Sequence, residues 1–283
     1  MPISTPSLPR TLLSQALYHE QQVVLQSFYY AQDVDTMTWI FLSPHLDDAV
    51  LSCGGLIYDL VISGQQVQIW TICAGDAPPG SLSPLALALH ERWQTGPESP
   101  KKRRAEDELA CHLLGAKPVH FDFPECIYRR HPITGQPVIG TNAELFQPLP
   151  GFEMPLMTRV SKLLSQQLYS VDKVVSPLAI GGHVDHHLVR SAAEMLGRPL
   201  YYYPDYPYHG GGAENLSGIN DPDWTATVHA ISKRALAAWQ QAVAAYRSQI
   251  STFWGSIDEM KSALQAYRKQ GGGNTLWFTE SPN

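Results

Sequence analysis

The sequence predicts an α/β fold built on a mainly parallel, doubly wound, Rossmann-like sheet with helices on both faces. Short β-like apolar runs alternate with stretches whose apolar residues recur at helical spacing, an order typical of parallel sheets. Long loops rich in Pro and Gly follow several predicted strands, at the edge where such sheets bind ligands. A helical N-terminal extension and a helical C-terminal part complete the predicted architecture.

The predicted elements follow in chain order. Residues 11–31 are expected to form a helix, because their apolar side chains recur at helical spacing. Apolar runs predict five strands, at 37–43, 66–73, 118–123, 172–178 and 199–204. Helices are predicted at 48–64, at 101–116, within 151–170, at 185–197 and over most of the chain after Ser232. Gly64 and Gly115 stand where the first two of these are expected to end.

Three long loops remain, at 74–100, 124–150 and 204–223. Loops of this length in a compact domain usually carry function or are mobile. No internal repeat or linker interrupts the pattern. We therefore expect residues 36–283 to form one domain, preceded by a helical extension at 1–35.

Composition excludes several classes of protein. The chain has 283 residues, of which 44% are hydrophobic and 16% charged, with a net charge of -6. Clustered positive charge is absent apart from KKRR at 101–104, so nucleic acid is not expected as a partner. No stretch approaches the roughly 20 apolar residues of a membrane span, and the first residues do not resemble a signal peptide. The four cysteines form no CxxC pair, which favours a reducing, cytoplasmic location. Both a monomer and a homo-oligomer are compatible with this composition.

A first polar cluster lies in SPHLDDAVLSCGG, where the first predicted strand passes into a helix. His45 and Asp48 are three residues apart, so both side chains can reach one cation, with Asp47 beside it. The alternative is that one aspartate only caps the helix, which is common. Glycine weakens a helix interior, so the pair Gly54 and Gly55 suggests close approach of a neighbouring backbone.

A second polar cluster, GGHVDHH, follows the strand predicted at 172–178. It places His183, Asp185, His186 and His187 within five residues, and imidazoles with a carboxylate are ligands that suit zinc. Solvated histidines beside a capping aspartate are the alternative. Two such clusters at the ends of two strands of one sheet favour a shared metal site, because both then point into the same crevice.

These two signatures together resemble the PIG-L/LmbE family of zinc-dependent de-N-acetylases, across about residues 37–200. The family has a His-Pro-Asp-Asp run before a glycine pair, a His-x-Asp-His run, and an Arg-x-x-Glu helix that ends in Leu-Gly. Arg103, Glu106, Leu114 and Gly115 fit the helix spacing. Leu46, Ala49 and Val184 depart from the usual residues, but none of them replaces a proposed ligand.

The resemblance implies a role for each matching residue. His45, Asp48 and His186 would bind one Zn²⁺ per chain, and a His₂Asp set also accepts other divalent ions. Asp47 would be the general base. His183 would stabilise the reacting carbonyl or act as an acid, and Asp185 would orient a histidine. His187 is an alternative ligand to His186. A further role falls to Arg103, which would hold the substrate or the site.

Three more residues are candidates for substrate binding. Asp76 lies early in the loop after the second strand, where it could meet a sugar hydroxyl or simply cap a turn. Asp205 and Tyr206 follow the fifth strand and could line the substrate crevice. For Tyr206 the alternative is packing within a loop bracketed by prolines.

The predicted function is a metal-dependent hydrolase that removes acetyl from an N-acetylated amino sugar or glycoside, by attack of metal-bound water. One alternative is a zinc amidohydrolase of a non-sugar N-acyl substrate. Another is an inactive metal-dependent binding protein, which the presence of both Asp47 and His183 disfavours.

Overall fold

A computed structural model describes residues 36–208 and 224–280 of the chain. The helix predicted at 11–31 and the extension at 1–35 lie outside the described residues, as does most of the loop 204–223. No helix in the described ranges is long and apolar enough to cross a membrane.

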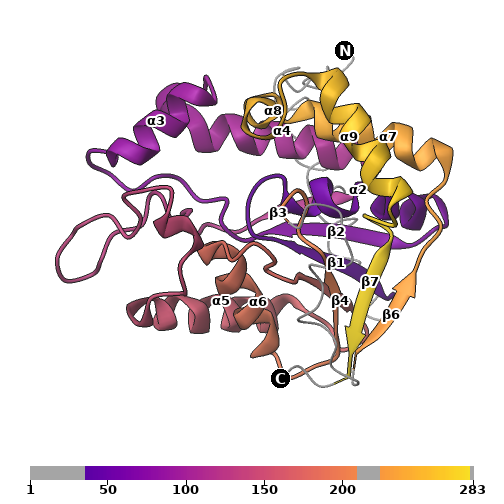
Figure 1. Cartoon of the computed structure of the whole chain (residues 1–283). Helices are drawn as coiled ribbons and strands as arrows, with labels where there is room; N and C mark the ends of the chain where they lie inside the picture. Colours follow the sequence, from indigo (N-terminus) through magenta and orange to yellow (C-terminus); the bar gives the residue numbers. More distant parts are fainter. Residues whose placement is uncertain (1–35, 209–223, 281–283) are drawn as a thin grey trace, which may run out of the picture. The chain divides into compact units, whose positions relative to one another are not determined.

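The centre of the fold is a seven-stranded sheet in the order β3-β2-β1-β4-β5-β7-β6 (Figure 1). The strands are β1 (Thr38–Ser43), β2 (Gln66–Thr71), β3 (Lys117–His120), β4 (Lys173–Pro177), β5 (Leu200–Tyr203), β6 (Thr225–Val228) and β7 (Thr275–Thr279). Strands β1 to β5 pair in parallel, whereas β7 is antiparallel to both β5 and β6. The mainly parallel sheet is confirmed.

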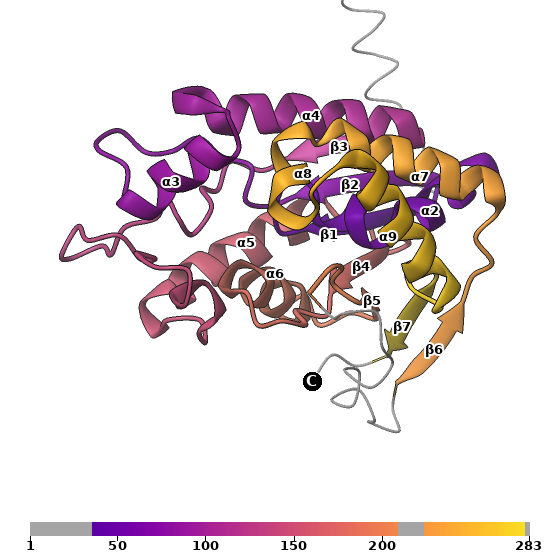
Figure 2. The same ribbon diagram turned by 45° about the horizontal axis from the view of Figure 1, so that its top comes forward.

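Helices cover both faces of the sheet, as predicted (Figures 1 and 2). The α-helices are α2 (Asp48–Ile62), α3 (Pro84–Arg92), α4 (Ser99–Leu114), α5 (Met154–Gln167), α6 (Val184–Glu194), α7 (Lys233–Ala245), α8 (Arg247–Phe253) and α9 (Ile257–Lys269). Short 3₁₀ turns are η1 (Gly96–Glu98), η2 (Glu144–Phe146) and η3 (Gly151–Glu153). Helices α2, α4, α7 and α9 pack in the apolar core on one face, and α5 and α6 in the core on the other.

Strand β1 shows how the two cores form. Successive side chains of a strand point to opposite faces, so Phe41 enters the core beneath α2 and Leu42 the core beneath α5 and α6. Both side chains are fully buried, as expected for a central strand covered on both faces. This is why the strand is a continuous apolar run.

The glycine pair in α2 makes room for a side chain, not for a neighbouring backbone as the sequence suggested. A Cβ atom at Gly54 would lie 2.3 Å from Cδ1 of Trp239 in α7, and one at Gly55 would lie 2.9 Å from Ile231. The indole Nε1 of Trp239 donates a hydrogen bond of 2.7 Å to the carbonyl of Val50. The pair thus lets a tryptophan of the C-terminal part bind directly to the helix that begins at Asp48.

Several element predictions need correction. The loop at 74–100 contains helix α3, whose N-terminus is capped by the Ser83 hydroxyl, and the turn η1. Strand β3 ends at His120, three residues earlier than predicted. Strands β6 and β7 were not predicted; β6 lies at the sheet edge with all four residues exposed, so it lacks the apolar alternation of a half-buried strand. The helix end at Gly115 is confirmed, with φ of 73°.

Candidate metal centre and cleft

The site lies where the strand order reverses. Strands β1 and β4 are neighbours, but the chain leaves β1 towards β2 and leaves β4 towards β5. Helices on opposite faces follow the two strands, which opens a crevice at their carboxyl ends. The first polar cluster follows β1 and the second follows β4, so the fold brings them together. The rings of His45 and His183 have centroids 4.8 Å apart.

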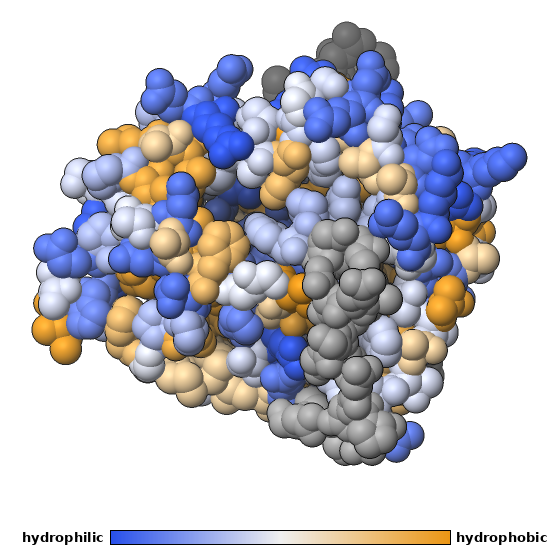
Figure 3. Space-filling model, viewed as in Figure 1, coloured by the Kyte–Doolittle hydropathy of each residue, from blue (hydrophilic) through white to orange (hydrophobic). Residues whose placement is uncertain are grey.

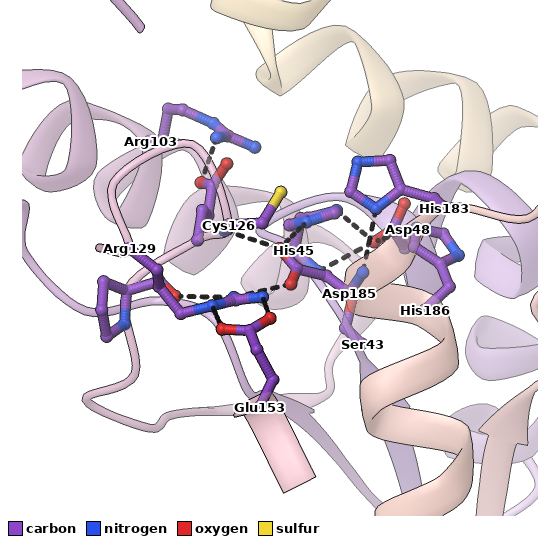
Figure 4. Close-up of polar contacts among 12 residues, drawn as sticks. Ser43, His45, Asp48, Arg103, Cys126, Arg129, Glu153, His183, Asp185 and His186 are labelled. Atoms are coloured by element: carbon purple, nitrogen blue, oxygen red, sulfur yellow. Dashed lines mark hydrogen bonds and ion pairs between the residues drawn. The ribbon is translucent and has the colours of Figure 1, made fainter. Parts of the chain in front are cut away.

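Two imidazoles converge on one carboxylate oxygen (Figure 4). The Oδ2 atom of Asp48 lies 3.1 Å from Nδ1 of His45 and 3.3 Å from Nε2 of His186. Burial alone would raise the pKa of Asp48, but the two histidines outweigh it and hold this pKa well below its usual range. All three side chains are almost completely buried. The arrangement gathers two nitrogens and one anionic oxygen around a single point.

The donor set fits a divalent metal such as Zn²⁺. Within the part of the chain that the structure describes, the buried Nε2 of His186 has no hydrogen-bond partner, although buried polar atoms rarely lack one. Burial would lower the pKa of His186, but Asp48 and Asp205 outweigh it and raise this pKa to about 9. The same negative environment that favours a proton on His186 favours a cation there.

Two other donor groups lie close by. Nitrogens of His45, His183 and His186 lie within 4.8 Å of one another, as do donor atoms of Cys126, His183 and Asp185. The second group is a poor ligand set, because Asp185 Oδ2 already accepts from the Cys126 backbone N–H and contacts His45. His187 belongs to neither group.

Each of the two histidines beside Asp48 contacts a second, buried aspartate through its other ring nitrogen. Asp185 Oδ2 lies 3.0 Å from Nε2 of His45, and Asp205 Oδ1 lies 2.5 Å from Nδ1 of His186. The second oxygen of Asp205 accepts a hydrogen bond from the backbone N–H of Ile180. These contacts leave Nδ1 of His45 and Nε2 of His186 facing Asp48. Asp205, which the sequence suggested for substrate binding, has both oxygens occupied and is 1% exposed.

An ion-pair network missed in the sequence supports Asp185. The guanidinium of Arg129 lies 2.6 Å from Asp185 Oδ1 and donates two hydrogen bonds to Glu153, at 2.7 and 2.6 Å (Figure 4). All three side chains are at most 6% exposed. Arg129 lies in the loop 124–150 and Glu153 in η3, so no local spacing signalled the contact.

The side chain of Asp47 does not cap helix α2, which was the alternative interpretation of this residue. Ser43 Oγ accepts a hydrogen bond from the backbone N–H of Ala49, and Asp47 makes no side-chain capping bond. Burial and the neighbouring charge of Asp48 raise the pKa of Asp47 to about 7. A carboxyl group with a pKa near 7 can both accept and release a proton near neutral pH.

His183 lines the same cleft as Asp47, and its imidazole is neutral. Its Nδ1 accepts a hydrogen bond from the backbone N–H of Asp185 at 3.2 Å, so its own proton lies on Nε2. Burial and the nearby His45 and His186 hold the pKa of His183 well below its usual range. The residue is therefore a hydrogen-bond donor towards the cleft rather than a cation.

A cleft of about 270 Å³ opens above the centre. His45, Asp47, Asp48 and His183 form part of its lining. Its walls come from α3, α8 and the loop 124–150, and apolar surface gathers on the α3 side of the molecule (left in Figure 3). Arg103 also lines the cleft, where it forms an ion pair with Glu125 and lies 4.6 Å from the ring centre of Trp93.

Like Asp205, the predicted substrate residues Asp76 and Tyr206 lie outside this lining. The exposed Asp76 pairs with Arg104 at 2.7 Å. Tyr206 is buried, with its ring 4.2 Å from that of Tyr267, which agrees with its packing interpretation. Tyr208, two residues further on, lines the cleft instead.

The fold is a mainly parallel α/β sheet, and two histidines and an aspartate surround one point at its edge. The carboxylate of Asp47, which makes no capping bond, lies beside them in the cleft. This combination is that of a metal-dependent hydrolase. The chain belongs to the PIG-L family, described as GlcNAc-PI de-N-acetylase, whose model matches residues 40–196. It is a hydrolase of N-acetyl amide bonds. The predicted family, fold class and enzyme class are confirmed.

Several similar proteins are named as deacetylases. A 2'-N-acetylparomamine deacetylase of Niallia circulans is 30% identical over 245 residues, which cover 80% of this chain and 86% of that protein. A deacetylase–teicoplanin complex has a TM-score of 0.71 at 26% identity and covers 87% of this chain and 99% of that one. The zinc-inhibited form of teicoplanin deacetylase has a TM-score of 0.68 at 26% identity, with 86% and 97% covered.

Proposed function

We propose that this hydrolase removes the acetyl group from an N-acetylated amino sugar, in a glycoside or aminoglycoside. The observation that carries the proposal is the convergence of His45 and His186 on Asp48, with the uncommitted carboxylate of Asp47 in the same cleft. Relatives named as deacetylases of acetylated paromamine and of teicoplanin support the substrate class.

The metal would be held by Nδ1 of His45, Oδ2 of Asp48 and Nε2 of His186. When bound, Zn²⁺ or another divalent ion polarises the acetyl carbonyl and makes water a better nucleophile. Asp185 and Asp205 fix the ring orientations of the two histidines. Hydrogen-bond partners of this kind raise the affinity of metal ligands for their ion.

Asp47 is the proposed general base. It would take a proton from the water that attacks the amide carbon, and a carboxyl with a pKa near 7 can pass that proton to the departing amine. His183 would donate its Nε2 proton in a hydrogen bond to the carbonyl oxygen as negative charge develops. The low pKa of His183 favours this donor role over that of an acid.

Acetate release tests the proposal. The purified protein, with its metal content measured, is incubated with N-acetylglucosamine, its glycosides and an N-acetylated aminoglycoside. We expect acetate release from at least one of them, a fall of about 100-fold or more in Asp47→Asn with metal retained, and no change in the control Asp76→Asn. Full activity in Asp47→Asn would refute the base assignment.

Two other functions give different results. An amidohydrolase of non-sugar substrates would release acetate from N-acetyl amino acids but not from the sugars. An inactive binding protein would bind metal and sugar without releasing acetate. Residence in the cytoplasm and assembly into a homo-oligomer stay predictions.

A further inference from the structure

We infer that the outer half of the cleft selects an N-acetyl amino sugar carrying an uncharged, flat apolar group next to the sugar, rather than a polycationic one. The inference rests on the proposed function and specifies its substrate. It is carried by the aromatic side chains around the cleft and by the pairing of the charges that line it.

Aromatic rings form one wall beside the reacting position. The Phe146 ring lies 5.8 Å from the His183 ring and 6.2 Å from that of Tyr208. The Tyr208 ring in turn lies 6.3 Å from Phe253 of α8. Phe146 is 45% exposed, although it lies in a loop next to the site. Large apolar side chains left exposed around a cleft usually mark a place that a ligand covers.

Further apolar side chains line the cleft. Leu89 and Trp93 of the α3 region and Ile127 and Leu145 of the loop 124–150 line the same cleft. The indole N–H of Trp93 is already bonded to Thr252 Oγ1 at 3.1 Å, which leaves the ring as a fixed surface. A flat group bound in this cleft would exchange water for apolar and aromatic contacts.

Apart from Asp47, the charged side chains that line the cleft have partners within the protein. Among its described lining residues, three carboxylates occur. Asp48 contacts both histidines and Glu125 pairs with Arg103, while Asp47 faces the reaction. Arg92 adds a further positive charge, with its guanidinium bonded to the carbonyls of Ser251 and Thr252. Among the described residues that line the cleft, no carboxylate other than Asp47 is therefore left for the ammonium groups of an aminoglycoside, and Arg92 would repel them.

Size agrees with a small substrate. A cleft of about 270 Å³ lies just below the range of roughly 300–1,000 Å³ found for drug-sized ligands. This space suits one sugar residue and one ring. A larger substrate would extend beyond the cleft.

The test compares methyl and phenyl glycosides of N-acetylglucosamine, in matched anomers, with an N-acetylated aminoglycoside. Burial of a phenyl ring predicts a kcat/KM roughly tenfold or more above that of the methyl glycoside, and the aminoglycoside should be the poorest substrate. Phe146→Ala should lower kcat/KM much more for the phenyl glycoside than for the methyl glycoside, and mainly through KM. Phe152→Ala is the matched control, because Phe152 is 38% exposed but lies outside the cleft lining.

The outcomes separate the two proposals. Acetate release with equal kcat/KM for the phenyl and methyl glycosides, or a preference for the aminoglycoside, would overturn this inference and leave the deacetylase function intact. Retention of the phenyl advantage in Phe146→Ala would also overturn it. Absence of acetate release from all three compounds, with metal bound, would refute the proposed function itself.

Discussion

Replacing Arg129 by methionine should strongly destabilise the protein. The substitution removes the guanidinium that forms ion pairs of 2.6 Å with both Asp185 and Glu153. Asp185 is 0% exposed and Glu153 is 5% exposed, so water cannot replace the guanidinium. Breaking a buried pair by removing one partner costs about 3–5 kcal/mol. Each kcal/mol lowers the Tm of a domain of this size by about 2–4 °C, so the expected fall is roughly 6–20 °C.

Thermal unfolding of the metal-free protein, followed by circular dichroism at neutral pH, measures this effect without the stability that a bound ion adds. The control is Lys101→Met, since Lys101 forms a solvent-exposed pair with Glu98 at 3.8 Å and should leave the Tm unchanged. Arg129→Lys should give an intermediate fall, because a lysine cannot donate the two parallel bonds to Glu153. A fall below 2 °C in Arg129→Met, roughly the effect of 1 kcal/mol, would show that the network does not support the site.

Three further predictions concern the metal centre and its helix. Asp205→Asn should weaken metal affinity about 10- to 100-fold in a chelator competition, because Asp205 holds the ring of His186. Gly54→Ala should cost about 1–3 kcal/mol in urea denaturation, since the new Cβ would lie 2.3 Å from Trp239. The pKa of Asp47 is raised by burial to about 7, so the folded metal-free chain keeps a proton that the unfolded chain loses near pH 4. Asp47→Asn should therefore raise the Tm of the metal-free protein at pH 8 and not at pH 4.

Controls and opposing outcomes are specific to each case. Asp76→Asn should keep full metal affinity, and an Asp205→Asn protein that does so too would contradict the orienting role. Gly151→Ala introduces a Cβ with no atom within 4 Å, so it should be neutral; an equal loss in both glycine variants would refute the packing argument. For Asp47→Asn, the prediction fails if the Tm exceeds that of the unsubstituted protein more at pH 4 than at pH 8.

The sequence predicted that the two polar clusters meet, because parallel topology determines where they lie. His45 follows β1 and His186 follows β4, and the carboxyl ends of neighbouring parallel strands share one edge. The same argument does not determine which contacts a residue makes after β5. Asp205 therefore looked like a cleft residue, whereas the structure places it behind His186.

Contacts between distant loops left no signal in the sequence. Arg129 and Glu153 are 24 residues apart, in segments without a periodic pattern, and they meet where Arg129 also contacts Asp185. Strand β7 was missed for a related reason. It lies between β5 and β6, and its place in the sheet depends on a chain reversal after α9.

The contact between Trp239 and the glycine pair means that helix α2 needs α7 for its packing. The family model matches residues 40–196, yet the indole that packs against the glycine pair of α2 comes from α7. A fragment that ends at residue 196 would leave the glycine pair uncovered and the Val50 carbonyl without its indole donor. Helix α7 therefore supports the helix that carries Asp48, and substitutions along α7 can disturb Asp48 from outside the cleft.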